Sequence, residues 1–252
     1  MVSSQLYWQP QKVNENLLTR IAVSPIPTWY ETEYTGITYI CFESDHEVQE
    51  HPVTMLSRFD RGGFFGLHGH PGGEEILVLE GNFTDETGIH TPGTYMLNPE
   101  GFIHRPYSDE GCLTFVKLRQ HGGTNRQQVR KNIYQLPWQP GIIPQIEVKP
   151  LYEQMGFPEK VWIERWQPGT ELLNVVESEV KEIFVIEGTW SDELGNYPTH
   201  SWLRYPPGCS YSPSSTTGCM VYVKTYPIEA TRFIVGKDFR HPQVMNIGVA
   251  DL

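Results

Sequence analysis

The chain lacks the features that mark membrane, secreted and disordered proteins. None of its apolar runs approaches the roughly 20 residues that a membrane-spanning helix needs. Its first twenty residues lack the basic start and the apolar core of a signal peptide. Charged residues make up 19% of its 252 positions, too few for a coiled coil or a disordered chain. We therefore expect a soluble, cytoplasmic protein that does not bind membranes.

Basic residues and paired cysteines are also scarce. Lys and Arg number 19 against 30 Asp and Glu, which gives a formal net charge of -11. An acidic surface repels phosphate backbones, so the composition argues against nucleic-acid binding. The cysteines form no CxxC pair, and we expect reduced thiols. They are Cys41, Cys112, Cys209 and Cys219.

Long amphipathic helices are missing as well. No periodic apolar stretch reaches the length of a substantial helix, whereas 23 Gly and 20 Pro are scattered along the chain. Short strands at regular spacing predict an all-β sandwich or barrel, and closure into a barrel or jelly roll removes exposed sheet edges. In the first half of the chain, the apolar runs of strand length span 37–42, 55–59, 75–80, 93–97 and 113–118.

The sequence contains an internal repeat at an offset of 107 residues, without gaps. Residues 75–88 read EILVLEGNFTDETG, and residues 182–195 read EIFVIEGTWSDELG. Sixteen of the fifty positions from 68 to 117 are identical to the residue 107 places later. Chance does not produce such a match in the same order, so the chain consists of two copies of one domain.

The repeat sets the expected domain limits. We predict an N-terminal extension over 1–24, a first domain over 25–125 and a second over 136–245. The stretch RQHGGTNRQQVRKN, from residue 119, is polar and contains glycine, as a linker should. We expect the extension to pair with an exposed sheet edge.

Two motifs in the first copy predict a metal site. The motif G-x5-H-x-H-x3-E-x6-G starts at Gly62 and contains His68, His70 and Glu74, and the motif G-x5-P-x-G-x2-H ends at His104. Because residues i and i+2 of a strand face the same side, the first two histidines point inward together. Turns then bring the carboxylate and the third histidine to that side. Three imidazoles and one carboxylate suit one divalent transition metal per chain better than magnesium or calcium.

The surroundings of this site leave several alternatives open. Iron and zinc are the first expectations for the metal, with manganese and nickel as alternatives. Glu75 is the alternative carboxylate, although a strand would turn it away from the site. We expect Phe64, Tyr95 and Phe102 to line a pocket for a small-molecule ligand. The remaining histidines are expected at solvated positions: His46, His51, His90, His121, His200 and His241. Of these, His90 precedes Gly93 in a turn and is the one that could lie near the mouth of the barrel.

The second copy does not keep the three histidines and the glutamate at the four equivalent positions. A valine cannot bind a metal, and a lysine would place a positive charge where the cation would lie. We therefore expect a degenerate domain that packs against the first; the alternative is a small metal-free pocket formed by the three polar replacements. In the order of the four ligands above, the replacements are Val175, Glu177, Lys181 and Tyr211.

Both motifs resemble the two conserved motifs of the cupin superfamily. The stretch HGHPGGEEILVLEG, followed by DETG, GTY and PEGFIHRP, more specifically resembles the ChrR-like cupin family. The resemblance covers about residues 25–120 well and the second copy more weakly. It implies two tandem cupin barrels, which are double-stranded β-helix or jelly-roll folds. The family is akin to dioxygenases that cleave acetylacetone and dihydroxyacetophenone.

The resemblance implies a metal-dependent dioxygenase-type enzyme that acts on a small diketone-like or hydroxyketone-like molecule. In such an enzyme Glu74 would be a catalytic residue, which either stays bound to the metal or acts as a base. The alternatives are a metal-binding protein without turnover and a sensor like the cupin half of the anti-sigma factor ChrR. ChrR holds its sigma factor through an N-terminal helical zinc-binding domain. Only about 25 residues, without Cys or His, precede the first domain here, so the resemblance does not imply a sigma-factor partner. We expect a monomer or a homodimer, since a bicupin already contains the contact that single cupins make by dimerising.

Overall fold

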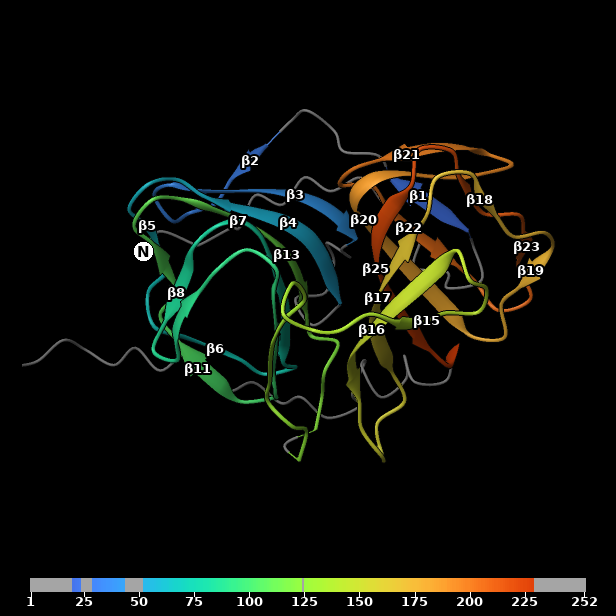
Figure 1. Ribbon diagram of the computed structural model, residues 1–252. Coiled ribbons are helices and arrows are strands. Elements are labelled where there is room, and N and C mark those ends of the chain that lie inside the picture. Colours follow the sequence, from blue (N-terminus) through green and yellow to red (C-terminus); the bar gives the residue numbers. More distant parts are fainter. Residues whose placement is uncertain (1–19, 24–28, 44–51, 124, 229–252) are drawn as a thin grey trace, which may run out of the picture.

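The computed structural model describes residues 20–23, 29–43, 52–123 and 125–228, and nearly all regular structure in these residues is β-strand (Figure 1). The strands pair antiparallel throughout. Among these residues, no helix has the length and apolar character needed to cross a membrane. The prediction of an all-β chain with two tandem barrels is confirmed, because Figure 1 shows two barrels side by side, coloured blue to green and yellow to red.

The first barrel is built on a seven-stranded sheet and two smaller ones. Its strands are β2 (Tyr30–Glu31), β3 (Ile37–Glu43), β4 (Val53–Phe59), β5 (Gly63–Phe64), β6 (His68–His70), β7 (Glu74–Gly81), β8 (Phe83–Asp85), β9 (Gly88–His90), β10 (Thr94–Asn98), β11 (Phe102–His104), β12 (Tyr107–Ser108), β13 (Cys112–Leu118) and β14 (Val129–Asn132). The large sheet has the order β14-β10-β7-β13-β4-β3-β2. The small sheets are β5-β12-β8-β9 and β11-β6.

The second barrel repeats this plan. Its strands are β1 (Ile21–Val23), β15 (Gln139–Pro140), β16 (Ile146–Glu153), β17 (Lys160–Trp166), β18 (Thr170–Glu171), β19 (Val175–Val176), β20 (Val180–Asp192), β21 (Gly195–Pro198), β22 (Trp202–Tyr205), β23 (Ser210–Tyr211), β24 (Ser214–Ser215) and β25 (Cys219–Tyr226). The main path of its large sheet is β1-β22-β20-β25-β17-β16-β15. The long strand β20 also pairs with β21 and β24, and β19 pairs with β23.

Side chains of the main strands alternate between two environments. On β7, Ile76 and Val78 pack in the core of the first barrel, whereas Leu77 packs in a second core that both barrels share. The shared core also contains Phe184 and Trp202 of the second barrel. Burying one such large side chain contributes roughly 1.5–3 kcal/mol, so this core holds the two barrels together.

The barrels exchange their edge strands. β1 comes from the start of the chain, yet it pairs with β22 of the second barrel, where Figure 1 shows it in blue among orange strands. β14 begins 108 residues after β1 and pairs with β10 of the first barrel. Each copy of the repeat therefore supplies one edge strand to the large sheet of the other.

Equivalent residues meet at the centre of the interface. Phe115 and Tyr222 occupy the same position in the two copies, and their rings lie 5.3 Å apart. The Lys224 ammonium is 3.0 Å from Oε2 of Glu75, and the equivalent pair, Lys117 and Glu182, lies at 2.5 Å. Such reciprocal contacts are those of a two-fold symmetric dimer, here within one chain.

Several smaller expectations can be compared with the structure. The five strands predicted in the first copy are present. All four cysteines are free, as predicted. Part of the stretch expected as a linker forms β14, and both His121 and Arg126 within it are buried. These two polar side chains pair with the buried carboxylate of Glu159.

Candidate metal centre

Three histidines converge inside the first barrel from two paired strands. His68 and His70 lie at the two ends of the short strand β6, on the same side of it, and His104 ends β11, directly opposite His68 in the register. One nitrogen atom from each ring can be chosen such that all three lie within 4.8 Å of one another. The two-residue spacing and the antiparallel pairing together produce this convergence.

The carboxylate of Glu74 reaches the same point from the start of β7. Its Oε2 atom lies 3.5 Å from Nε2 of His70 and 3.5 Å from Nε2 of His104. The chain returns through a turn in which Gly73 has a φ of 71°, and a Cβ there would approach His121 to 2.7 Å. Glycine is therefore required at the position that turns Glu74 inward.

Two of the imidazole rings are oriented by bonds on their far sides. Nδ1 of His68 lies 2.9 Å from the carbonyl oxygen of Gly66, and Nδ1 of His104 lies 3.2 Å from Oδ2 of Asp85. An acceptor at Nδ1 places the proton there and leaves the lone pair on Nε2, the atom that faces the cluster in His104. Nε2 of His70 and Nε2 of His104 are 3.0 Å apart. This arrangement fits a divalent transition metal held by neutral imidazole nitrogen atoms.

Burial also keeps the imidazoles neutral. It lowers the pKa of His68 to about 4 and that of His70 to about 3, and the neighbouring histidines act in the same direction. Burial raises the pKa of the Glu74 carboxyl, although His104 and the amide of Asn98 partly offset it. Nδ2 of Asn98 donates a hydrogen bond of 2.9 Å to Oε2 of Glu74, which fixes that oxygen atom beside the histidines.

Asp85 is a site residue that the sequence analysis missed. Its carboxylate accepts from His104 and from His90, whose Nε2 is 3.1 Å away, and from the backbone N–H of Thr87. Burial opposes its ionisation, but these hydrogen bonds outweigh burial and lower the pKa of Asp85. The signal available was its identity with Asp192 in the other copy. Because the second copy lacks the histidines, that identity indicates that the barrel needs the aspartate but does not connect the aspartate with a metal.

The predicted pocket aromatics separate in the structure. The ring of Phe102 lies 5.3 Å from that of His104, beside the cluster. Phe64 is instead 56% exposed, and its neighbour Phe65 is the residue whose ring approaches His68, at 5.2 Å. Tyr95 is fully buried in the core shared by the two barrels. The predictions for Phe64 and Tyr95 were wrong because each lies one residue out of phase with the inward side of its strand.

The remaining histidines were also misjudged in part. His90 and His121 are buried, at 7% and 0% exposed, and not solvated as predicted. Each has a carboxylate partner, Asp85 for His90 and Glu75 for His121. Glu75 faces the second barrel and not the cluster, as expected for a residue next to Glu74 on a strand. The predictions for His46, His51 and His241 lie outside the described residues.

In the second barrel, the residues at the ligand positions bond to one another. The hydroxyl group of Tyr211 donates to Oε1 of Glu177 at 2.6 Å, and Nζ of Lys181 is 3.3 Å from the same oxygen atom. Val175 lies opposite Tyr211, as His68 lies opposite His104. These contacts satisfy the polar groups locally, which agrees with a structural role.

A cation from the N-terminal segment occupies the neighbourhood of this degenerate site. The guanidinium group of Arg20 pairs with Asp192, the counterpart of Asp85, and lies over the ring of Tyr205 at 4.9 Å. It also lies 5.9 Å from the centre of the Tyr211 ring. The second barrel thus balances its buried carboxylate with an arginine.

Two jelly-roll barrels in tandem, one of which carries three histidines and a glutamate in its interior, define a bicupin. The family model described as the ChrR cupin-like domain matches the chain twice, over residues 21–122 and 126–229. The chain therefore belongs to this family, in two copies. A search of curated proteins finds no match.

Solved structures with a similar fold include proteins of different kinds. Protein Ylba from E. coli is 14% identical, with a TM-score of 0.63 over 87% of this chain and 95% of that chain. The bacterial pirin YhhW from Escherichia coli, in complex with nickel(II), is 11% identical, with a TM-score of 0.62 over 83% and 99%. A salicylate 1,2-dioxygenase from Pseudaminobacter salicylatoxidans is 12% identical, with a TM-score of 0.54 over 74% and 73%. At these identities the likeness shows the fold alone.

Proposed function

We propose that the first barrel binds one divalent transition metal through His68, His70, His104 and Glu74 and performs a dioxygenase-type reaction on a small oxygenated molecule. The observation that carries the metal site is the orientation of His104, with Nδ1 on Asp85 and Nε2 towards His70 and Glu74. A ligating histidine almost always donates its other ring N–H to such an acceptor. When bound, the metal would supply a Lewis acid with open coordination positions and, as iron, redox chemistry towards dioxygen.

The chain's own residues would prepare this centre in two ways. The imidazoles of His68 and His70 stay neutral at physiological pH, so each offers a lone pair without losing a proton first. The rings of Phe65, Phe83 and Phe102 lie within 6.2 Å of a histidine ring of the cluster and would limit the access of water to it. A small diketone-like or hydroxyketone-like substrate would place its apolar part against these rings.

Glu74 has two candidate roles, as a ligand and as a base. Its buried carboxylate has a raised pKa and lies against two imidazole nitrogen atoms. The variant Glu74→Gln tests the choice, since an amide can occupy the same space but cannot accept a proton. Metal content that is retained while turnover is lost would favour the base; loss of the metal would favour the ligand role.

The proposal is tested first by metal analysis of the purified protein. We expect about one equivalent of a transition metal in the wild type and less than a tenth of that in His104→Ala. Tyr211→Phe changes the equivalent position of the second barrel and should leave the metal content unchanged. Oxygen uptake with β-diketones and hydroxyacetophenones then tests the reaction. A protein without transition metal would contradict the site, and a metal-loaded protein without oxygen uptake would contradict the dioxygenase assignment.

A further inference from the structure

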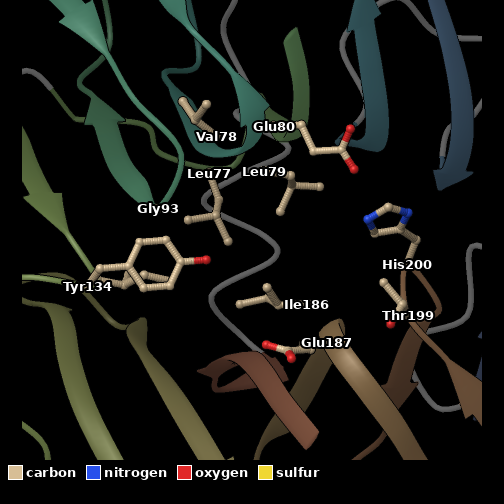
Figure 2. Close-up of a pocket in the computed structure, with 11 residues that line it drawn as sticks. Leu77, Val78, Leu79, Glu80, Gly93, Tyr134, Ile186, Glu187, Thr199 and His200 are labelled. Atoms are coloured by element: carbon tan, nitrogen blue, oxygen red, sulfur yellow. The ribbon is translucent and has the colours of Figure 1, made fainter.

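A cavity of about 250 Å³ lies between the two barrels, and none of the cluster histidines lines it. Figure 2 shows Leu79 and Glu80 of the first copy on one side and Ile186 and Glu187 of the second on the other. Leu79 is the repeat counterpart of Ile186, and Glu80 is that of Glu187. The cavity therefore forms where equivalent parts of the two copies meet, and domain interfaces are favoured positions for ligand sites.

A β-bulge in each copy directs one side chain into this cavity. The register between β13 and β7 passes from Glu80 to Val78 and leaves Leu79 unpaired. The register between β20 and β25 passes over Ile186 in the same way. Bulges bend a strand and change the direction of a side chain, and they recur beside functional sites. Both copies thus use the same irregularity to form an apolar wall.

His200 holds a strained conformation at the edge of the cavity. Its φ is 70°, and the equivalent residue of the first copy is Gly93, with a φ of 82°. A residue other than glycine costs on the order of 1–3 kcal/mol in such a conformation. The imidazole stacks on Phe184, with the ring centres 6.0 Å apart and an interplanar angle of 9°, and in Figure 2 it points towards Glu80. The second copy keeps a histidine where the fold itself needs only a glycine.

The charged side chains that line the cavity are all negative. Glu80 and Glu187 are its charged members, and its described lining residues include no Lys or Arg. Neither carboxylate forms an ion pair within the part of the chain that the structure describes. The hydroxyl group of Tyr134 points into the same space, and Leu77 and Ile133 extend the apolar wall. The complementary ligand has a positive charge at one end and an apolar body.

We propose that the inter-barrel cavity binds a small organic cation, an amine with an apolar chain or ring. The exposed carboxylate of Glu80, beside the His200 ring, attracts the ammonium group, and Leu79 and Ile186 contact the apolar body. The exposed carboxylate of Glu187, on the opposite side, adds to the negative potential of the cavity. The volume of about 250 Å³ is below the roughly 300–1,000 Å³ of drug-sized sites, so the ligand is small. This site is separate from the metal centre and does not depend on its chemistry.

The test compares hexylammonium with hexanol and hexanoate by titration calorimetry on the full chain, with and without metal. We expect hexylammonium to bind about tenfold more tightly than hexanol, a difference of about 1.4 kcal/mol, and hexanoate not to bind. The double variant Glu80→Gln/Glu187→Gln should reduce hexylammonium to the affinity of hexanol. Equal affinities for the amine and the alcohol in the wild type, or no binding of either, would overturn the proposal.

Two further variants separate the ligand site from folding. Ile186→Phe fills the cavity and should abolish binding, whereas Glu110→Gln changes an exposed carboxylate outside the cavity and should have no effect. His200→Gly should fold at least as stably as the wild type, because glycine suits its φ, yet bind hexylammonium several-fold more weakly. Unchanged affinity in Ile186→Phe and in His200→Gly would contradict the assignment of the ligand to this cavity.

Discussion

At the residue scale, the first barrel and the second differ most in what balances their buried carboxylates. Asp85 faces two imidazoles, of which His104 belongs to the proposed metal centre. Its counterpart Asp192 faces the guanidinium group of Arg20 and the hydroxyl group of Tyr205. The same carboxylate, kept in both copies, therefore pairs with a histidine of the proposed metal centre in one barrel and with an arginine in the other.

Asp85→Asn should weaken metal binding by about 10–100-fold, because an amide no longer holds Nδ1–H of His104 as an ionised acceptor does. The measurement is a competition titration against a chelator. Asp192→Asn is the matched control, and its metal affinity should equal that of the wild type. An Asp85→Asn protein with unchanged affinity would show that Asp85 does not orient the ligand.

At the scale of single elements, the exchanged strand β14 connects the second copy to the proposed metal centre of the first. Arg130 on this strand donates from Nη2 to Oδ1 of Asn98 at 2.5 Å, and Asn98 in turn donates to Glu74. The next residue, Lys131, points the other way and bonds to the carbonyl oxygen of Leu151 in the second barrel. One face of β14 thus supports the side chain of Glu74 through Asn98, and the other face bonds to the second barrel.

Arg130→Ala should free the Asn98 side chain and lower metal affinity by about tenfold, since partners of a ligating carboxylate tune its position. The same competition titration measures it. Lys131→Ala, on the opposite face of β14, is the control and should lower stability without changing metal affinity. Equal metal affinities in Arg130→Ala and the wild type would remove Arg130 from the support of the site.

At the scale of the whole molecule, buried ion pairs cross the interface in both directions. Glu75 accepts from Tyr222 at 2.6 Å and from Lys224 at 3.0 Å, and Glu182 accepts from Lys117 and from Tyr226. An ion buried without its partner is costly, so these pairs penalise any other docking of the two barrels. They specify one arrangement within the apolar core that supplies most of the attraction.

Lys224→Met should destabilise the protein by about 3–5 kcal/mol, because it leaves the Glu75 carboxylate buried without its cation. The double variant Glu75→Leu/Lys224→Met removes both charges and should be more stable than the single one. Urea unfolding of the wild type, both single variants and the double variant gives the coupling energy. Additive effects would show that the pair does not interact energetically.

Acid should destabilise the interface for the same reason. Burial opposes the ionisation of Glu159, but His121 and Arg126 outweigh it and lower its pKa from 4.5 to about 2. Lys224 and His121 likewise hold the pKa of Glu75 well below its usual value. A carboxyl whose pKa is lower in the folded state stabilises the fold above its unfolded pKa, and this contribution disappears as the pH falls towards the folded value.

We therefore expect the urea midpoint to be constant from pH 7 to about 5 and to fall from there towards pH 2. Glu159→Gln removes one of the responsible groups, so its midpoint should be lower at pH 7 and depend less on pH in this window. A Glu159→Gln profile parallel to that of the wild type would mean that Glu159 does not contribute.

The sequence by itself determined the repeat, the strands and the convergence of the proposed ligands. The reason is that all three depend on local rules. The alternation of side chains on a strand brings His68 and His70 to one side. A turn at Gly73 brings Glu74 to them, and the turn before His104 brings the third histidine. The same rule turned Glu75 away from the site. The loss of the ligand types in the second copy was equally readable, because Val175 cannot replace a histidine.

Only the tertiary structure decided what the second face of each sheet touches. Tyr95 fits a metal pocket and an inter-barrel core equally well by composition, and the phase of β10 selects the core. His121 is buried because Glu75 and Glu159 approach it from separate parts of the chain, which no local pattern encodes. The exchange of β1 and β14 and the cavity beside His200 arise in the same way. They depend on how one copy of the repeat packs against the other, and packing partners far apart in sequence are set by the complete fold.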